Sequence, residues 1–506
     1  MYRSDRVGTG AWRPTMLFPT VDFAIFFTVV FTVSWLLVDN SFLRIIPYEI
    51  QGTVSAFLRS RFQWRKIFLI LASYFFYGYW NWKFMFLLLA CSVGNYLFGL
   101  ALGRDYPDRT RRIILTSAVT WNLAILGFFK YFGFFVSSFN NLLTVLRLDA
   151  HMPLLDIILP VGISFFTFQA MSYVIDVYRR DTPYARSLLD VLLYISFFPQ
   201  LVAGPIVRAR DFIPQLQRDP DPSRIAAARA FLLIMAGLFK KVIVANYIAT
   251  ELVDPVFEDP LAFSSPEVLL AVYGYAVQIY CDFAAYSEIA IGVAALMGYH
   301  YPDNFNNPYR AQSLRDFWRR WHISLSTWLR DYLFISLGGS RHGKWQTYRN
   351  IAITMVLGGL WHGASWNFVL WGALHGFGLT VERIFADIFG TRKKAVFLQV
   401  ISVIVVFHFV CLGWVFFRAR SFALAIEYLR ALGNVHVAST LLTPFVIALL
   451  VIGIGMHFMP PQPGIWARRS FSRLPALVQG IILALLLLAL SAFGSEGVAP
   501  FIYFRF

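Results

Sequence analysis

One histidine stands inside an apolar, aromatic run, where residues 358–376 read GGLWHGASWNFVLWGALHG. His362 needs hydrogen-bond partners within the protein, because lipid offers none and a polar side chain there costs free energy. The neighbouring glycines let a ligand or another helix approach the backbone closely, and Trp361 offers a large rigid wall for a substrate. The run therefore predicts a cavity within the membrane. His375, near the far end of the run, is expected at the membrane interface instead.

The chemistry that fits this position is general-base catalysis. A neutral histidine commonly removes the proton of a hydroxyl group, so His362 is predicted to activate an alcohol. Nucleophilic catalysis has no support, because the chain contains neither a G-x-S-x-G motif nor a cysteine beside a histidine. No metal site is expected either, since no H-x-x-x-H or H-E-x-x-H pair occurs.

A second histidine, His322, lies in a stretch of a different kind, NNPYRAQSLRDFWRRWHISLSTWLRDYLF at 306–334. Its charges and aromatic residues are interleaved, which is typical of a helix that lies in the membrane interface with its aromatic rings inserted. Taken together with the first histidine, His322 becomes a candidate catalytic residue. The candidates for substrate contact in this layer are Trp318, Arg319 and Trp321.

Two further polar residues interrupt apolar runs and are candidates for substrate contact. Gln169 follows Pro160 and Gly162 in LPVGISFFTFQ, where the proline and glycine indicate a broken helix. A kink repaired by neighbouring helices and a direct contact with substrate are both open interpretations. Asp282 shares one face of an apolar helix with Tyr286, four residues later. Its carboxylate either contacts substrate or bonds to a neighbouring helix.

The composition indicates which elements must hold these residues. Of the 506 residues, 58% are hydrophobic and only 14% are charged, whereas soluble domains are about 45 to 50% apolar and about 25% charged. The chain is therefore predicted to be an all-α polytopic membrane protein. Because ~20 apolar residues cross a bilayer as a helix, roughly 11 or 12 crossings are expected, with some re-entrant or interfacial helices.

The predicted crossings are defined by their apolar runs. They cover residues 17–38, 67–79, 84–102, 113–129, 154–174, 188–203, 231–248, 268–297, 351–374, 400–417, 441–457 and 478–492. The first run is predicted to be an uncleaved span, because no small-residue cleavage site follows it. Residues 1–16 form a polar N-terminal extension, and residues 17–506 are predicted to form a single membrane domain.

The basic residues predict the orientation. The formal net charge is +16, and in a membrane protein such an excess indicates cytoplasmic loops rather than a nucleic-acid surface. The loops at 104–112 and 310–330 hold the dense arginine clusters and are predicted to face the cytoplasm. The three cysteines are far apart in apolar stretches, which indicates neither a disulfide framework nor a zinc site.

The two histidine motifs and several ordered blocks resemble one known family. The blocks are MLFPTVDFAIFF, LPVGISFFTFQ, FFPQLVAGPI, DFAAYSEIAIG, GWVFFRA and the closing FIYFRF. Together they are similar to the membrane-bound O-acyltransferase family, in its bacterial branch of alginate O-acetyltransferase type. The resemblance implies a ring of tilted helices around a central tunnel. It also implies that the family's intramembrane histidine corresponds to His362 and its second histidine to His322.

The resemblance also implies an activity and its partners. Such proteins sit in the bacterial inner membrane and move an acyl group, usually acetyl, from a cytoplasmic donor to a secreted or wall polysaccharide. We expect an acyl thioester as donor, either acetyl-coenzyme A or an acyl carrier protein, and no bound cofactor. Membrane lipid surrounds the protein, a periplasmic acetyltransferase is the expected partner, and no nucleic acid is involved.

Two other functions are the alternatives. One is a D-alanyl transferase of the same family, which would act with a carrier protein on teichoic polymers. The other is a transporter that moves a polysaccharide or a lipid-linked sugar without chemistry. Transporters often carry internal repeats with matching broken helices, and the sequence contains no such pair of segments.

Overall fold

The computed structural model describes residues 16–38, 51–148, 150–390, 395–493 and 501. These residues form helices and connecting segments, and no β-strand occurs among them. The all-α class predicted from the sequence is confirmed. Of the predicted N-terminal extension, only Met16 lies among the described residues, and its side chain is buried.

The helices follow one another along the chain in three groups. The first group holds α1 (Val21–Leu36), α2 (Gln51–Gly78), α3 (Lys83–Leu102), α4 (Asp108–Leu126), the π-helix η3 (Gly127–Tyr131), α5 (Phe132–Val145), α6 (Ile163–Arg179), α7 (Leu188–Ser196), α8 (Phe198–Leu201), α9 (Ala209–Phe212), η4 (Ile213–Gln217) and η5 (Pro222–Arg224). The second holds α10 (Ala227–Phe239), η6 (Lys240–Ala245), α11 (Asn246–Ile248), η7 (Ala249–Val253), α12 (Asp254–Glu258), η8 (Pro260–Ala262) and α13 (Ser265–Leu296). The third holds η9 (Pro308–Arg310), α14 (Leu314–Arg320), α15 (Ile323–Trp328), η10 (Leu329–Phe334), α16 (Lys344–His362), α17 (Trp366–Phe389), α18 (Val396–Arg418), α19 (Phe422–Ala431), α20 (Pro444–Gly455), α21 (Gln462–Arg473) and α22 (Ala476–Phe493).

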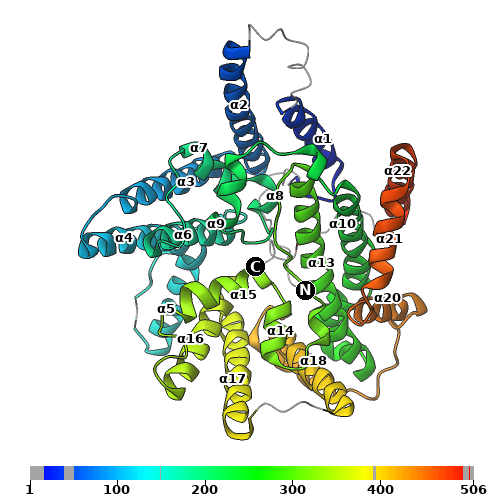
Figure 1. The fold of residues 1–506 in the computed structure, drawn as a ribbon. Coiled ribbons are helices and arrows are strands. Elements are labelled where there is room, and N and C mark those ends of the chain that lie inside the picture. The colour runs from blue at the N-terminus through cyan, green and yellow to red at the C-terminus, as the bar shows by residue number, and fades with distance from the viewer. Residues whose placement is uncertain (1–15, 39–50, 149, 391–394, 494–500, 502–506) are drawn as a thin grey trace.

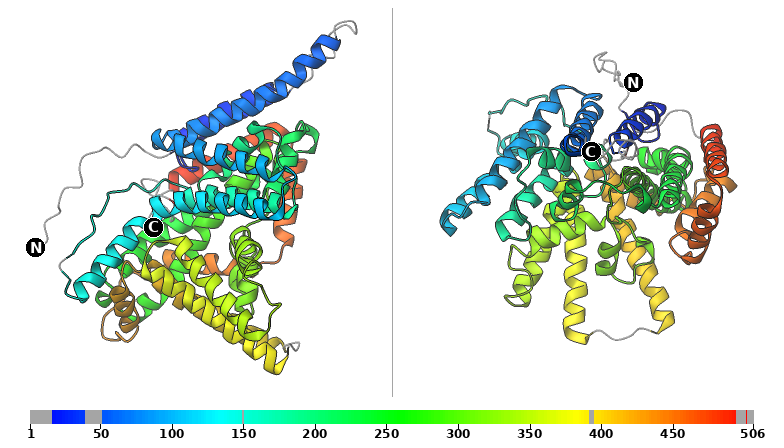
Figure 2. Two further views of the ribbon diagram at one scale, coloured as in Figure 1. Left: turned by 90° about the vertical axis from the view of Figure 1, so that its left-hand side faces the viewer. Right: turned by 45° about the horizontal axis from the view of Figure 1, so that its top comes forward.

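Helix α13 runs through the middle of the molecule, and the other helices surround it (Figure 1). Helix α10 packs along α13, while α3, α4 and α6 form a separate layer. In the most apolar part of α13, 83% of the residues are buried, whereas none are buried in the corresponding part of α22. Helix α13 is therefore a central helix, and α22 turns its apolar side chains outward. Figure 2 shows α2 extending past the other helices.

The start of α13 shows how sequence fixes a helix end. Ser264 and Glu267 form a capping box, in which each side chain bonds the other's backbone N–H. The Glu267 carboxylate also accepts the backbone N–H groups of Thr440 and Leu441 at 2.5 and 2.7 Å. One acidic residue therefore caps α13 and holds the segment before α20 against it.

Six stretches of the described chain are long and apolar enough to cross a membrane. They are Lys83–Leu102, Asp108–Val145, Ala227–Glu258, Ser265–Leu296, Val396–Arg418 and Ala476–Phe493. Two shorter apolar helices, Val21–Leu36 and Pro444–Gly455, lie within further predicted spans. The protein is thus a multi-pass membrane protein, while the total of 11 or 12 crossings stays a prediction.

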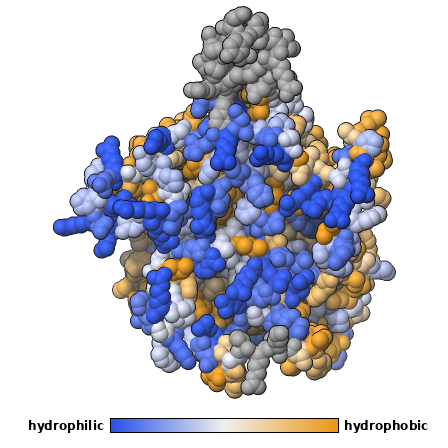
Figure 3. All heavy atoms as spheres, viewed as in Figure 1, coloured by the Kyte–Doolittle hydropathy of each residue, from blue (hydrophilic) through white to orange (hydrophobic). Residues whose placement is uncertain are grey.

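Hydrophilic residues cover the face seen in Figure 3, with apolar residues gathered toward its rim.

The predicted crossing at 351–374 is wrong, because the chain turns back within it. Helix α16 ends at His362, and α17 begins at Trp366 and returns along it. Two glycines allow this close packing. A Cβ atom on Gly359 would lie 2.1 Å from the carbonyl oxygen of Phe368, and one on Gly372 would lie 2.4 Å from that of Met355. The two helices therefore form a hairpin with His362 at its turn.

Two other predicted crossings also differ from the structure. In the run at 154–174, residues up to Pro160 are not helical, and α6 begins only after Gly162, whose φ is +75°. The prediction of a broken helix at this proline and glycine is wrong, because no helix precedes them in this run, and the crossing cannot begin at residue 154. The run at 188–203 forms the short helices α7 and α8, whose residues are mostly buried in the protein.

The predicted orientation can be tested at two exposed arginines. Arg109 lies in the first turn of α4 and Arg330 in η10, and both side chains are exposed. The basic segments 104–112 and 310–330 that contain them are predicted to face the cytoplasm. A single cysteine at either position should resist an impermeant thiol reagent added to intact cells and react after the membrane is opened. The wild-type chain is the background control, because its three cysteines are buried. Labelling of either cysteine in intact cells would reverse the predicted orientation.

Candidate active site

His362 lies at the turn of the α16–α17 hairpin, and only 3% of its surface is exposed. Aromatic rings enclose its imidazole. The ring centres of Trp361, Trp371 and Phe417 lie 5.1, 5.0 and 5.3 Å from that of His362, and each ring meets it edge to face. The expected position inside the protein is therefore confirmed, and the imidazole lies among large apolar walls.

His322 is fully buried and precedes α15 in an unusual backbone conformation. Its φ is +42°, and a left-handed conformation costs a residue other than glycine about 1 to 3 kcal/mol. Such strain persists only where the surroundings enforce it. The Ile323 N–H beside it donates to the backbone carbonyl of Asn304 at 2.9 Å. The ring of Phe283, from α13, lies 4.5 Å from the imidazole.

Trp361 contacts both histidines. Its ring centre is 6.0 Å from that of His322 and 5.1 Å from that of His362. The rings of Phe165 and Phe168 of α6 also pack on the indole, at 5.2 and 5.5 Å. The structure thus brings together three of the residues predicted from the sequence, from segments 40 residues apart. Their catalytic and substrate-binding roles stay predictions.

Asn304 determines which nitrogen of His322 carries the proton. Its side-chain oxygen accepts the Ser324 backbone N–H at 3.1 Å and lies 3.2 Å from His322 Nδ1. A backbone N–H can only donate, so this atom is the oxygen, and we infer that Nδ1 of a neutral His322 is the protonated nitrogen. The Asn304 side-chain N–H group in turn donates to Ser287 at 3.0 Å.

The other nitrogen of His322 is left as an acceptor. Nε2 is buried and has no hydrogen-bond partner among the described residues. With Nδ1 protonated, Nε2 carries a lone pair. His322 can therefore accept a proton or a hydrogen bond from a bound molecule.

Sequence reasoning missed Asn304 and Lys130. Asn304 lies in an ordinary polar loop, YPDNFNNPY, which gives no signal of its partner. Lys130 did carry a signal, because it is a single lysine in the apolar run GFFKYFGFF, and an ionisable residue within a span is a functional candidate by default. Its amino group lies at the end of α16, where it donates to the carbonyl of Trp361 at 2.5 Å.

The interpretation of residues 306–334 as an interfacial helix with its aromatic rings in lipid is wrong. The segment folds into η9, α14, α15 and η10, and its rings pack inside the protein. Trp321 is 1% exposed, with its ring 5.1 Å from that of Trp414. Trp318 is half-buried against Trp371, at 5.7 Å. The side chain of Arg319 is exposed.

His375 was expected at the membrane interface, and this is also wrong. Its side chain is fully buried, and neither ring nitrogen has a hydrogen-bond partner among the described residues. The rings of Trp371 and Trp318 lie 4.8 and 5.3 Å from it. Helix α17 continues to Phe389, so His375 lies in the middle of this helix instead of at its end.

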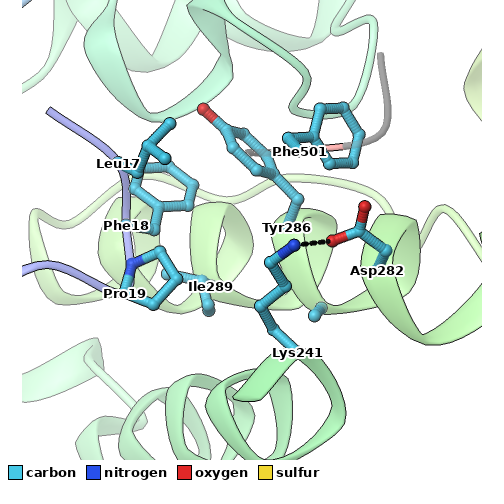
Figure 4. A pocket seen from close by; sticks show the side chains of 9 residues that line it. Leu17, Phe18, Pro19, Lys241, Asp282, Tyr286, Ile289 and Phe501 are labelled. Atoms are coloured by element: carbon cyan, nitrogen blue, oxygen red, sulfur yellow. Dashed lines mark ion pairs between the residues drawn. The ribbon is translucent and has the colours of Figure 1, made fainter. Parts of the chain in front are cut away.

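Asp282 bonds to a neighbouring helix, which was one of its two open interpretations. Its carboxylate forms a 2.7 Å ion pair with Lys241 of η6 (Figure 4), and both side chains are buried. The pair borders a small apolar pocket with Phe18, Tyr286 and Phe501. Contact of Asp282 with a substrate stays a prediction.

Gln169 also makes a bond between helices. Its side-chain N–H group donates to the carbonyl of Tyr194 in α7 at 2.5 Å, and its side chain is buried. It lies one residue after Phe168, which packs on Trp361. Gln169 thus positions α6 against α7 behind the wall of the candidate site.

Within the described residues, no three His, Cys, Asp or Glu side chains are grouped as metal ligands would be.

Comparisons with known proteins show which family the sequence matches. Residues 180–425, which include both histidines, match the model of the MBOAT, membrane-bound O-acyltransferase family. A probable alginate O-acetylase AlgI from Azotobacter vinelandii is 37% identical over 488 residues, which are 88% of this chain and 95% of that protein. A peptidoglycan O-acetyltransferase from Helicobacter pylori is 36% identical over 395 residues, 72% of this chain and 73% of that protein. A teichoic acid D-alanyltransferase from Bacillus subtilis is 29% identical over 293 residues, 54% of this chain and 72% of that protein.

The chain belongs to the membrane-bound O-acyltransferase family. The resemblance noted in the sequence is confirmed, and with it the class of the protein as a multi-pass membrane enzyme that transfers acyl groups to hydroxyl oxygen.

Asn304→Leu should lower kcat/KM, because it removes the acceptor that fixes the proton on Nδ1 of His322. We expect a loss smaller than the ~10² to 10⁴-fold that removal of a general base costs. Acyl transfer by the purified variant measures this effect. Asn95→Leu is a matched control, since Asn95 is another buried asparagine and bonds to Asn122 between α3 and α4. Equal losses in the two variants would assign Asn304 a purely structural role.

Proposed function

We propose that this protein moves an acetyl group from a cytoplasmic thioester donor across the membrane to a hydroxyl acceptor on the outer side, for O-acetylation of a secreted or cell-wall polysaccharide. The names of its relatives support acetyl as the acyl group and a polysaccharide as the acceptor. The observation that carries the proposal is that two buried histidines both lie beside Trp361, and that one of them, His362, is at the turn of the α16–α17 hairpin.

The reaction needs one base and no covalent intermediate on the enzyme. His362 accepts the proton of the acceptor hydroxyl while that oxygen attacks the thioester carbonyl carbon. The carbon–sulfur bond then breaks, and the leaving thiolate takes the proton from the imidazolium. An alcohol and a thioester become an ester and a thiol, so atoms and charges balance. The aromatic walls around His362 exclude water, which would otherwise hydrolyse the thioester.

His322 serves the donor side in this proposal. Its Nε2 is an acceptor beside aromatic rings, so it can bind an N–H of the donor's arm or the S–H of the released thiol. The segment that carries it belongs to the basic region predicted to face the cytoplasm. Exposed Arg319 and its neighbours provide a positive field for the phosphates of coenzyme A or for an acidic carrier protein.

The cellular setting is also part of the proposal. We place the protein in the bacterial inner membrane, with the donor on the cytoplasmic side and the acceptor on the outer side. No bound cofactor is needed, because the thioester is itself the substrate. A periplasmic acetyltransferase is the proposed partner that passes the acetyl group on to the polymer.

Acetyl transfer is better supported than D-alanyl transfer. The similarity to the alginate O-acetylase extends over 88% of this chain, whereas the similarity to the teichoic acid D-alanyltransferase extends over 54%. A transporter without chemistry does not fit a member of an acyltransferase family.

The two histidines should fail in different ways. His362→Ala should lower transfer to a soluble sugar acceptor by about 10² to 10⁴-fold while donor binding is kept, because only the base is lost. His322→Ala should weaken donor binding itself. Both quantities can be measured on purified protein with a labelled acetyl thioester, once with coenzyme A and once with a carrier protein as the thiol.

The expression level and melting temperature of each variant in detergent serve as controls for folding. Wild-type transfer by His362→Ala would remove the base from the mechanism. Equal donor binding with equal loss of product in both variants would mean that the histidines act as one unit, and the assignment of His322 to the donor side would be wrong.

A further inference from the structure

The π-helix η3 places two polar side chains against the end of α16. Lys130 donates from Nζ to the carbonyl of Trp361 at 2.5 Å and of His362 at 3.3 Å. The hydroxyl of the next residue, Tyr131, donates to the carbonyl of Leu360 at 2.8 Å. Three consecutive carbonyls, the last of them on the proposed base, are therefore bonded by two adjacent residues of another helix.

These carbonyls need partners from outside α16. The last four carbonyl oxygens of an α-helix find no N–H donor within that helix. Inside a membrane protein, water is too scarce to supply one. The chain leaves the helix at Gly363, whose N–H reaches the carbonyl of Gly359 only at 3.4 Å. A positive group at this end also interacts favourably with the helix dipole. The end of α16 thus depends on Lys130 and Tyr131 for its geometry.

The hydrogen bonds of Lys130 define what it can do. An ammonium group has three N–H donors, and three acceptors surround this one, because Ser164 Oγ lies 3.0 Å from Nζ in addition to the two carbonyls. No N–H remains for a substrate oxygen. Ser164 belongs to the first turn of α6, and its backbone carbonyl faces the indole N–H of Trp361 at 3.4 Å. Lys130 therefore joins α6 and α16 around the candidate site.

We propose that Lys130 and Tyr131 are positioning residues that hold the His362 imidazole in its working orientation. The proposal rests on the function proposed above for His362. The π-helix fits this role, since such irregular turns are frequent at functional sites. Without the two side chains the last turn of α16 would fray, and the imidazole would leave its place against Trp361 and Trp371.

The test compares Lys130→Met, Lys130→Arg and Tyr131→Phe with wild type in acetyl transfer from a labelled thioester to a soluble sugar. Lys130→Met should lower kcat about tenfold or more, with little change in the KM of the donor. Lys130→Arg should recover part of this loss, because it keeps the charge and the donors. Tyr428→Phe is the matched control for Tyr131→Phe, since Tyr428 is a buried tyrosine that donates to the carbonyl of Val268.

Hydrogen exchange provides a readout that does not depend on activity. Amides at residues 359–365 should exchange at least about tenfold faster in Lys130→Met than in wild type, while those of α13 stay unchanged. Unchanged exchange at 359–365, or a wild-type kcat in Lys130→Met, would overturn the proposal. If the wild-type protein transfers no acetyl group, the function proposed above is wrong. The hydrogen-exchange comparison then still shows whether the two side chains hold the end of α16.

Discussion

The close packing of α16 against α17 is the contact on which the position of His362 depends. Gly359 and Gly372 bring the two backbones so near that a single added Cβ atom would meet a carbonyl oxygen at 2.1 or 2.4 Å. Small residues at such contacts are the common means of packing helices in membranes. The hairpin turn then lies inside the protein, where Trp361, Trp371 and Phe417 surround the imidazole.

The helices around the hairpin are joined to one another by paired polar groups. Inside a membrane protein an unpaired charge is costly, and removing one partner of a buried pair leaves the other uncompensated. Lys66 pairs with Asp190 at 2.6 Å between α2 and α7, and Lys241 pairs with Asp282 at 2.7 Å between η6 and α13. Lys130 follows the same rule with backbone carbonyls as its partners. These bonds join the layers of helices that enclose the two histidines.

The sequence predicted the class of the protein and the two histidines, because both follow from local signals. A composition rich in apolar residues indicates membrane helices, and a histidine among tryptophans and glycines indicates an enclosed polar site. Tertiary packing decides the rest. Hydropathy does not distinguish a crossing at 351–374 from a hairpin, since the turn depends on what Gly359 meets in the folded protein. His375 was misplaced for the same reason, because the end of an apolar run is not the end of α17.

The aromatic segment at 306–334 gives a second example of this limit. Interleaved arginines and tryptophans indicate amphipathic helices, but the pattern is the same whether the rings face lipid or the protein interior. Trp321 and Trp328 face the interior, at 1% and 7% exposure. The proton position on His322 depends on Asn304, a residue from a loop with no distinctive pattern. A contact such as the one between Asn304 and His322 is seen only in the folded structure, where the two segments come together.

The O-acetyl content of surface polysaccharide tests the central claim most directly. It should be measured in cells that lack the gene and carry either the wild-type protein or His362→Ala, with equal amounts of each in the membrane. Cells with the wild-type protein should carry O-acetyl esters, and cells with the variant none above background. Equal acetylation in the two strains would contradict the claim.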